Sequence, residues 1–278
     1  MSKINIFKKI YRILNKFLLI IFSKVISQFL KPLGLIIVPS YDKIKNFAYY
    51  FSPLSRRLIF YPKKNEFNKI IVDTSSNFSL LCQLGGEKYQ TAKSPYANWH
   101  RCGYTGFYNL LFSNLKDKKI NFAEIGVETN DSIKMWREYF SNATIHGFEF
   151  YEEKIKKAQT DGLKNTFYHK IDVRSKEDII KSFNQTNTKF DIIIDDSTHY
   201  FDDQINIIKN CNQFLEKNGI LIIEDIYKSR KGYSELDYYN SLKDIKNSFN
   251  EIVFIETKHV NNYSANYKFE KILVLIKK

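Results

Sequence analysis

The sequence predicts an α/β protein in which helices cover both sides of a mostly parallel sheet. From residue 120 onward, short apolar runs alternate with helix-like stretches, a pattern typical of parallel sheets. Runs such as DIIIDD and ILIIED are continuously apolar, as a strand buried on both faces must be. We therefore expect the main domain at residues 119–278, after a helical lead-in at 67–118.

The end of the chain breaks this alternation. After a predicted helix at 234–249, strands at 251–258 and 271–276 follow with no helical pattern between them. A connection of about a dozen residues can join antiparallel strands but hardly holds a crossover helix. We therefore expect seven strands and a terminal antiparallel hairpin. The first five strands are predicted at 120–126, 144–150, 166–171, 190–195 and 219–224, and the helices between them at 131–140, 152–160, 176–184 and 201–217.

The N-terminal arm, residues 1–66, carries most of the excess charge. It holds 13 of the 43 Lys and Arg residues but only two acids, Asp42 and Glu66, so the rest of the chain is nearly neutral despite a net charge of +13. This distribution argues against a nucleic-acid partner. Within residues 4–31, polar side chains recur every three or four positions, which predicts a basic amphipathic helix. Pro32 and Gly34 end it.

The arm is too polar to span a membrane. The longest charge-free run of the predicted helix at 4–31 is 17–23, whereas a spanning helix needs about 18 apolar residues. No small-residue cleavage site follows, so we do not expect a secretory signal. The helix fits an anionic membrane face and equally well the protein's own body or a second subunit in a homo-oligomer.

The cysteines indicate a reducing compartment. They are odd in number, scattered, and form no CxxC pair, which argues against a disulfide framework. We therefore expect a cytoplasmic protein, peripheral on the inner membrane face if the arm binds lipid. The residues are Cys82, Cys102 and Cys211.

Polar residues stand at the predicted carboxyl ends of the first three strands, where open α/β sheets bind ligands. The loop EIGVETNDS, residues 124–132, contains a single glycine, Gly126, instead of a GxGxxG fingerprint. Such a loop receives a pyrophosphate poorly, but it suits an adenosine ligand that carries an ammonium and a sulfonium. Glu149 follows the second strand and suits ribose hydroxyls. Asp172 follows the third and suits an adenine amino group.

The fourth and fifth strands end in DDSTH, residues 195–199, and in Glu224 and Asp225. Neighbouring strand tips lie about 5 Å apart, so up to four carboxylates and an imidazole share one crevice. A divalent cation that prefers oxygen ligands, Mg²⁺ or Mn²⁺, resolves the repulsion between the carboxylates. His199, three residues after Asp196, suits a general base. The alternative is that Asp195 and Glu224 only cap turns while His199 faces solvent.

These segments together resemble the class I S-adenosylmethionine-dependent methyltransferases, and more narrowly the metal-dependent sugar O-methyltransferases related to macrocin O-methyltransferase. The similarity covers roughly residues 85–278. A terminal antiparallel hairpin also separates methyltransferase sheets from dinucleotide-binding ones. The segments that carry the resemblance are GEKYQTAKSPYANWHRCGYTGFY, EIGVETNDSIKMW, HGFEF, FDIIIDDSTH and GILIIEDI.

The resemblance implies a Rossmann-like seven-stranded sheet that binds S-adenosylmethionine and methylates a sugar hydroxyl. The implied acceptor is a nucleotide-activated or glycan sugar of a bacterial capsule or surface polysaccharide. Asp196, Glu224 and Asp225 would bind the metal, and His199, assisted by Asp196, would carry the catalysis. The residues implied to hold the cofactor are Tyr104, Thr105, Glu124, Gly126, Ser132, Glu149 and Asp172, to which we add Asp195.

The sequence departs from the family pattern in two places. Related sequences usually have glycines where Asn130 and Asp131 stand. They also often read GTDK where this chain reads YQTAK, which weakens any role for Lys93.

Three other classes of protein remain open. A nicotinamide-dependent sugar oxidoreductase could use the same sheet, although the glycine fingerprint is missing. A non-haem iron oxygenase would need a second histidine at a strand tip. A non-catalytic, membrane-associated polysaccharide assembly factor would leave the cofactor site degenerate.

Overall fold

The computed structural model describes most of the chain after residue 67 and short parts before it. The described residues are 14, 18, 21, 25, 26, 28, 29, 35–39, 58–62, 68–98, 101–228, 230–259, 261 and 271–278. The chain divides into two compact units, Met1–Glu66 and Phe67–Lys278.

In the first unit, strands β1 (Leu35–Pro39) and β2 (Leu58–Pro62) pair antiparallel, with Leu35 opposite Pro62. The described positions between 14 and 29 are helical. Their large apolar side chains recur every three or four residues and are exposed, up to 76% at Phe29. The remaining positions of the predicted helix at 4–31 lie outside the described residues. Among described residues, no helix is long and apolar enough to cross a membrane.

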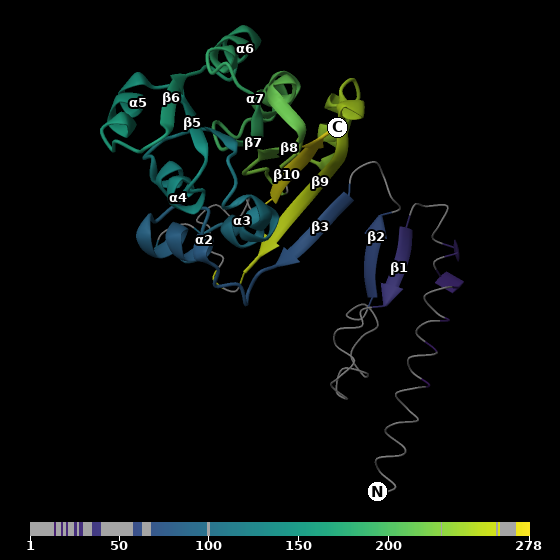
Figure 1. The fold of residues 1–278 in the computed structure, drawn as a ribbon. Helices are drawn as coiled ribbons and strands as arrows, with labels where there is room; N and C mark the ends of the chain where they lie inside the picture. Colours follow the sequence, from purple (N-terminus) through teal and green to yellow (C-terminus); the bar gives the residue numbers. More distant parts are fainter. Residues whose placement is uncertain are drawn as a thin grey trace, which may run out of the picture. The chain divides into compact units, whose positions relative to one another are not determined.

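The second unit is built on an eight-stranded sheet of order β3-β9-β10-β8-β7-β4-β5-β6 (Figure 1). All its pairings are parallel except those of β10, which runs antiparallel to β8 and β9. The predicted α/β class and terminal hairpin are therefore confirmed. The bounds are β3 (Asn68–Asp73), β4 (Asn121–Ile125), β5 (Thr144–Glu149), β6 (Thr166–Lys170), β7 (Phe190–Asp195), β8 (Leu215–Ile223), β9 (Phe249–Lys258) and β10 (Lys271–Lys277).

The sequence pattern predicted neither β3 nor the two strands of the first unit, which lie in the connector that follows the predicted helix. Strand β3 extends the sheet beyond the hairpin by pairing parallel to β9, with Asn68 opposite Val253. As an edge strand it leaves Ile70 and Ile71 about half exposed, so it lacks the fully apolar pattern of a central strand. Strand β8 begins four residues before the predicted position because Leu215 already pairs with Phe190, and the preceding helix ends at Cys211.

Helices cover both faces of this sheet. One core packs side chains of α3, α4 and α5 against the sheet, including Tyr108 and Trp136. The other packs α6, α7 and α8, including Phe183, Ile207 and Tyr238. The predicted helix at 234–249 is shorter, because α8 ends at Ser241 and turns follow. The bounds are α2 (Leu80–Gln83), α3 (Tyr104–Phe112), α4 (Asp131–Tyr139), α5 (Glu152–Gln159), α6 (Lys176–Asn184), α7 (Phe201–Cys211) and α8 (Glu235–Ser241).

The connections change direction between β4 and β7. From β4 the chain continues through β5 to β6 and then returns to β7 on the other side of β4. Backbone hydrogen bonds extend the pairing beyond the strand ends, from Asp196 N to Ile125 O at 2.8 Å and from Glu224 N to Asp195 O at 2.9 Å. The tips of β4, β7 and β8 are therefore held side by side at the switch point where such sheets bind ligands.

Candidate functional site

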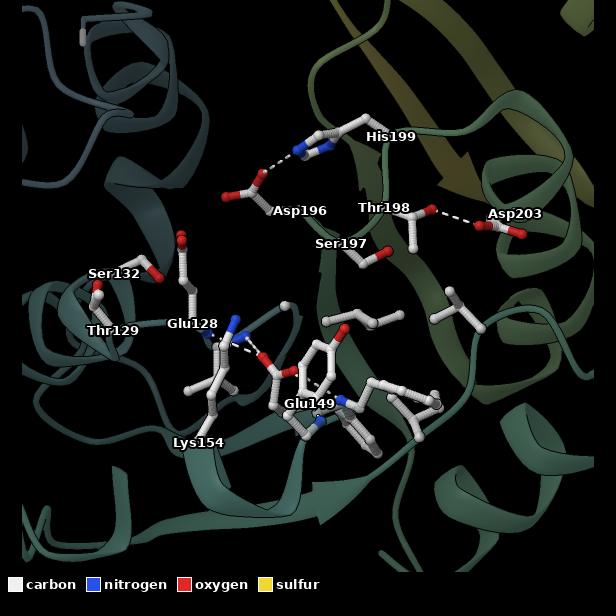
Figure 2. Close-up of a pocket in the computed structure, with 18 of the residues that line it drawn as sticks. Glu128, Thr129, Ser132, Glu149, Lys154, Asp196, Ser197, Thr198, His199 and Asp203 are labelled. Carbon is white, nitrogen blue, oxygen red and sulfur yellow. Dashed lines mark hydrogen bonds and ion pairs between the residues drawn. The ribbon is translucent and has the colours of Figure 1, made fainter. Parts of the chain in front are cut away.

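A cavity of about 710 Å³ opens at these carboxyl ends (Figure 2), within the size range of small-molecule sites. Half of the predicted site residues line it: Gly126, Ser132, Glu149, Asp172, Asp196 and His199. The others do not belong to its lining, namely Tyr104, Thr105, Glu124, Asp195, Glu224 and Asp225.

The loop after β4 requires glycine at position 126. Gly126 has φ +98°, and a Cβ there would lie 2.1 Å from the Asp196 carbonyl oxygen. The Glu149 carboxylate fixes this loop, because Oε2 accepts hydrogen bonds from Val127 N at 3.2 Å and Glu128 N at 3.1 Å. The backbone therefore passes close to the cavity with no side chain in between.

Glu149 also accepts two hydrogen bonds from its own strand end. Its Oε1 is 2.9 Å from Phe150 N and 3.1 Å from Tyr151 N. The carboxylate thus joins the ends of β4 and β5, and it lines the cavity while only 6% exposed. Its predicted contact with ribose hydroxyls stays a prediction.

Asn130 adopts the backbone conformation for which related sequences use glycine. It precedes α4 with φ +70°, the left-handed region that favours glycine and tolerates asparagine. Its amide donates to Asp161 Oδ2 at 2.8 Å and accepts from the Tyr168 hydroxyl at 2.9 Å. The departure from the family pattern is therefore compatible with the turn.

Asp172 has a partner that the sequence reading did not anticipate. Arg174 donates from Nε and Nη2 to its two oxygens, each at 2.8 Å, and this pairing lowers the pKa of Asp172. The guanidinium lies 4.9 Å from the centroid of the exposed Phe150 ring. Asp172, Arg174 and Phe150 therefore form one wall of the cavity.

The centre of the carboxylate cluster is a lysine. Lys93 is 2% exposed, and its Nζ lies 3.1 Å from Glu124 Oε1, 2.5 Å from Glu224 Oε2 and also contacts Asp196. These carboxylates follow or end three different strands. Burial alone would lower the pKa of Lys93, but the carboxylates outweigh it and raise that pKa well above its ordinary value. The departure from the GTDK pattern argues against a role for Lys93, but in the structure this residue connects the cluster.

Helix α3 adds two hydroxyl donors to the cluster. Tyr108 donates to Glu224 Oε1 and Tyr104 donates to Asp225 Oδ1, each at 2.7 Å. The predicted cofactor residue Tyr104 thus contacts a predicted metal ligand. Thr105 is fully buried, with its hydroxyl 3.3 Å from Cys82 Sγ.

Asp196, His199 and Asp225 form a set that could hold a metal ion, since one ligand atom from each lies within 4.8 Å of the others. His199 Nε2 is 3.7 Å from Asp225 Oδ2 and 4.0 Å from Asp196 Oδ1 (Figure 2 shows the contact with Asp196). Carboxylate oxygens with one imidazole fit Mg²⁺ or Mn²⁺. Glu224, also a predicted ligand, already has both oxygens engaged by Tyr108 and Lys93.

The electrostatics of the cluster also favour a cation. Burial raises the pKa of Asp225 and raises that of Glu224 well above its ordinary value. Burial likewise raises the pKa of Glu124. One ammonium therefore faces more carboxylates than it can neutralise, and a divalent cation would supply the missing charge.

Two residues of this set have a strained backbone. His199 has φ +58° and Asp225 has φ +54°, which costs a non-glycine residue roughly 1–2 kcal/mol. Such strain tends to gather at functional sites.

Asp195, directly before this set, accepts hydrogen bonds from Ser197 N at 3.2 Å and Ser197 Oγ at 2.6 Å. Burial raises the pKa of Asp195 to about 6.

The loop after β8 carries a further cation, Arg230. The Tyr233 hydroxyl accepts from Phe201 N at 3.1 Å, two residues after His199. Arg230 lies 5.0 Å from the Tyr227 ring centroid and 5.1 Å from that of Tyr233. Neither Arg230 nor Arg174 stood out in the sequence. Lys93 had a signal, since it shares the lysine of the GTDK pattern.

The sheet order, the antiparallel β10 and the cavity at the switch point define the architecture of the class I methyltransferases. The family model described as "Methyltransferase domain" matches residues 117–271. Because this match covers more than half of the chain, the chain belongs to that family.

Curated relatives come from Streptomyces. An 8-demethyl-8-(2-methoxy-alpha-L-rhamnosyl)-tetracenomycin-C 3'-O-methyltransferase of Streptomyces olivaceus is 25% identical, over 52% of this chain and 37% of its own length. An L-olivosyl-oleandolide 3-O-methyltransferase of Streptomyces antibioticus is 22% identical, over 51% and 36%. The chain thus spans little more than a third of the length of these relatives.

A solved structure shares the fold. The MycE methyltransferase from the mycinamycin biosynthetic pathway, in complex with Mg, SAH and mycinamycin VI, has a TM-score of 0.54 and 16% identity. The likeness covers 71% of this chain and 54% of MycE. The family match, rather than this likeness of fold, counts against the nicotinamide and oxygenase alternatives.

Proposed function

We propose that this protein transfers a methyl group from S-adenosylmethionine to a sugar hydroxyl with the help of one divalent cation, Mg²⁺ or Mn²⁺. The observation that carries the proposal is the grouping of Asp196, Asp225 and His199 beside a cavity that reaches the Gly126 loop. The relatives named above act, by their names, on rhamnosyl and olivosyl groups. MycE was solved with Mg and SAH.

In this proposal each residue has one task. When bound, the cofactor supplies the methyl group and the cation supplies the charge that lowers the pKa of the acceptor hydroxyl. Asp196 and Asp225 would hold the cation, with Glu224 completing the set if Tyr108 or Lys93 yields an oxygen. His199 would act as the base and not as a ligand of the cation, so its imidazole would accept the hydroxyl proton. The walls of the cavity align oxygen, methyl carbon and sulfur, and this alignment would supply much of the rate.

The cofactor would lie against the end of β4. Gly126 and Glu128 offer close backbone approach, Glu149 and Asp172 lie where ribose and adenine are expected, and Ser132 lines the same cavity. We retain Tyr104, Thr105, Glu124 and Asp195 as supporting residues that position this site from outside its lining.

For the acceptor we propose a nucleotide-linked sugar of a capsule or surface polysaccharide. Arg230, which contacts the rings of Tyr227 and Tyr233 in the loop after β8, would offer a cation to a phosphate of such an acceptor. The test is a screen of nucleotide-activated sugars with S-adenosylmethionine and Mg²⁺, read by a mass gain of one methylene. An Arg230→Gln variant should raise KM for a nucleotide-linked acceptor but not for the matching neutral glycoside.

The role of His199 is tested by His199→Ala. Loss of a general base should lower turnover by about two to four orders of magnitude, while Mn²⁺ and the cofactor product still bind. His259→Gln, a histidine outside the cavity, serves as the control. Near-normal turnover of His199→Ala, or unaltered wild-type activity in excess chelator, would contradict this mechanism.

We further propose that the N-terminal helix binds an anionic membrane face, which would place the enzyme peripherally on the inner membrane. Its described apolar side chains are exposed, and lysines alternate with them in the sequence. The full chain should float with anionic liposomes, and Leu18→Asp with Val25→Asp should abolish flotation. Leu110→Asp, equally exposed on α3, is the control. Equal flotation of all three proteins would refute the membrane contact and favour protein packing.

A further inference from the structure

Lys93 reaches the sheet from a segment that is not part of it. Its backbone is fixed on both sides, because Lys93 O accepts from Thr105 N at 3.1 Å and Ala92 O accepts from Cys102 N at 2.8 Å. The side chain is held by a backbone that is tied to the start of α3. Its ammonium is therefore placed by the fold and is not a mobile surface charge.

The ammonium contacts carboxylates from three strand ends. Glu124 stands in β4, Asp196 follows β7 and Glu224 follows β8. Without a cation between them, these carboxylates would repel one another in a buried setting, where unpaired charge is costly. Lys93 relieves this repulsion whether or not a ligand is present.

We propose that Lys93 is a positioning residue, a built-in counter-cation that holds the tips of β4, β7 and β8 together before metal or cofactor binds. Its ammonium contacts Oδ2 of Asp196 and Oε2 of Glu224. The side of Asp196 that faces Asp225 and His199 is left for one divalent cation. The inference rests on the proposed function only in taking this crevice as the place of methyl transfer.

The same ammonium connects the two halves of the crevice. Glu124 offers one oxygen to Lys93, and its Oε2 accepts from Ser132 Oγ at 2.8 Å. Ser132 lines the cavity on the proposed cofactor side, whereas Asp196 belongs to the proposed metal set. Displacing Lys93 should therefore disturb cofactor and metal binding together.

The first test is the thermal unfolding of the full chain with Lys93→Met, in chelator and in Mg²⁺. The wild type should gain only the modest stabilisation that binding of Mg²⁺ to its folded state gives. The variant should lose several degrees in chelator and regain most of the loss in Mg²⁺, because a divalent cation then becomes the only counter-charge. Lys88→Met removes a surface ion pair with Glu138 and should behave like the wild type. If Lys93→Met lowered the unfolding temperature equally in chelator and in Mg²⁺, Lys93 would contribute through packing alone and the proposal would be wrong.

A charge-matched double variant keeps the test decisive if Lys93→Met does not fold. Lys93→Met with Glu224→Gln removes one charge of each sign, so it should be more stable in chelator than Lys93→Met alone. A double variant no more stable than the single would overturn the proposal. Neither measurement uses methyl transfer. If the wild type bound neither Mn²⁺ nor the cofactor product, the proposed function would fail, whereas the comparison in chelator would still decide the role of Lys93.

Discussion

Glu149 shows how a single side chain can build a binding loop. Its two oxygens accept four backbone N–H groups, from Val127, Glu128, Phe150 and Tyr151. Hydrogen bonds to a charged acceptor are stronger than neutral ones. The carboxylate therefore fixes the loop after β4 independently of any ribose contact.

Glu149→Gln should test this structural role. The amide nitrogen would face two backbone donors, so we expect a loss of about 2 kcal/mol in the free energy of unfolding together with weaker binding of the cofactor product. Urea denaturation and calorimetric titration measure the two effects. Glu153→Gln, an exposed carboxylate on α5, is the control. Unchanged stability of Glu149→Gln would show that the loop does not depend on this carboxylate.

At the residue scale, sequence reasoning located polar residues at strand ends but not their partners. Asp196, His199 and Asp225 could be grouped because strand tips are neighbours by topology. Lys93 could not, because its contacts depend on how the segment before α3 folds back onto the sheet. The pairing of Arg174 with Asp172 is local, but sequence alone does not show whether two such side chains turn towards each other. The hydrogen bond from Tyr108 to Glu224 likewise depends on where α3 packs against the sheet, and the periodicity of a sequence does not predict this.

The start of α4 illustrates the element scale. The helix begins after Asn130, whose left-handed backbone turns the chain from the Gly126 loop into α4. This conformation raises the conformational energy of most L-residues, whereas it costs glycine nothing and asparagine less. The entry of the helix, and with it the position of Ser132 in the cavity, depends on this one residue.

Asn130→Ala and Asn130→Gly separate the two contributions of this residue. Both variants lose the side-chain hydrogen bonds to Asp161 and Tyr168, but only alanine adds backbone strain. Alanine should therefore be less stable than glycine by about 1 kcal/mol, measured by urea denaturation. Equal stabilities would mean that the turn relaxes, and the comparison with wild type would then report the hydrogen bonds alone.

Strands whose burial is complete were predicted from their own sequence, and so was the half-exposed edge strand β6, whereas the other edge strand, β3, was missed. The central strands β4, β7 and β8 have continuous apolar runs, which are typical of strands buried on both faces. Strand β3 is a half-exposed edge, so its sequence has no comparable pattern. The shortening of α7 follows from the pairing of Leu215 with Phe190, a contact between segments that the local sequence does not encode.

At the scale of the whole molecule, the neighbouring strands β5 and β6 carry a pair of histidines, one on each strand. His146 Nδ1 lies 2.9 Å from His169 Nε2, and the two rings stack at 5.1 Å. Burial lowers the pKa of His146 to about 4 and also lowers that of His169. Both imidazoles are therefore neutral in the folded protein at neutral pH.

This pair should make stability fall in acid. The unfolded histidine titrates near 6.5, so its contribution is complete above that pH and is lost as the pH falls towards 4. Between pH 7.5 and 5, the wild type should lose about 2 kcal/mol more than His146→Phe. The buried carboxyl groups have the opposite dependence but are common to both proteins, so they cancel. Parallel stability curves for the two proteins would contradict the shift.

His199 and Asp225 place folding stability and chemistry in opposition. Both hold backbone angles that glycine would adopt at no cost. A designer who sought only a more stable protein would put glycine at both positions, and any gain in melting temperature would come with the loss of the imidazole and one of the carboxylates of the proposed metal set. Selection for thermostability alone, without an activity screen, would therefore tend to remove the proposed metal set.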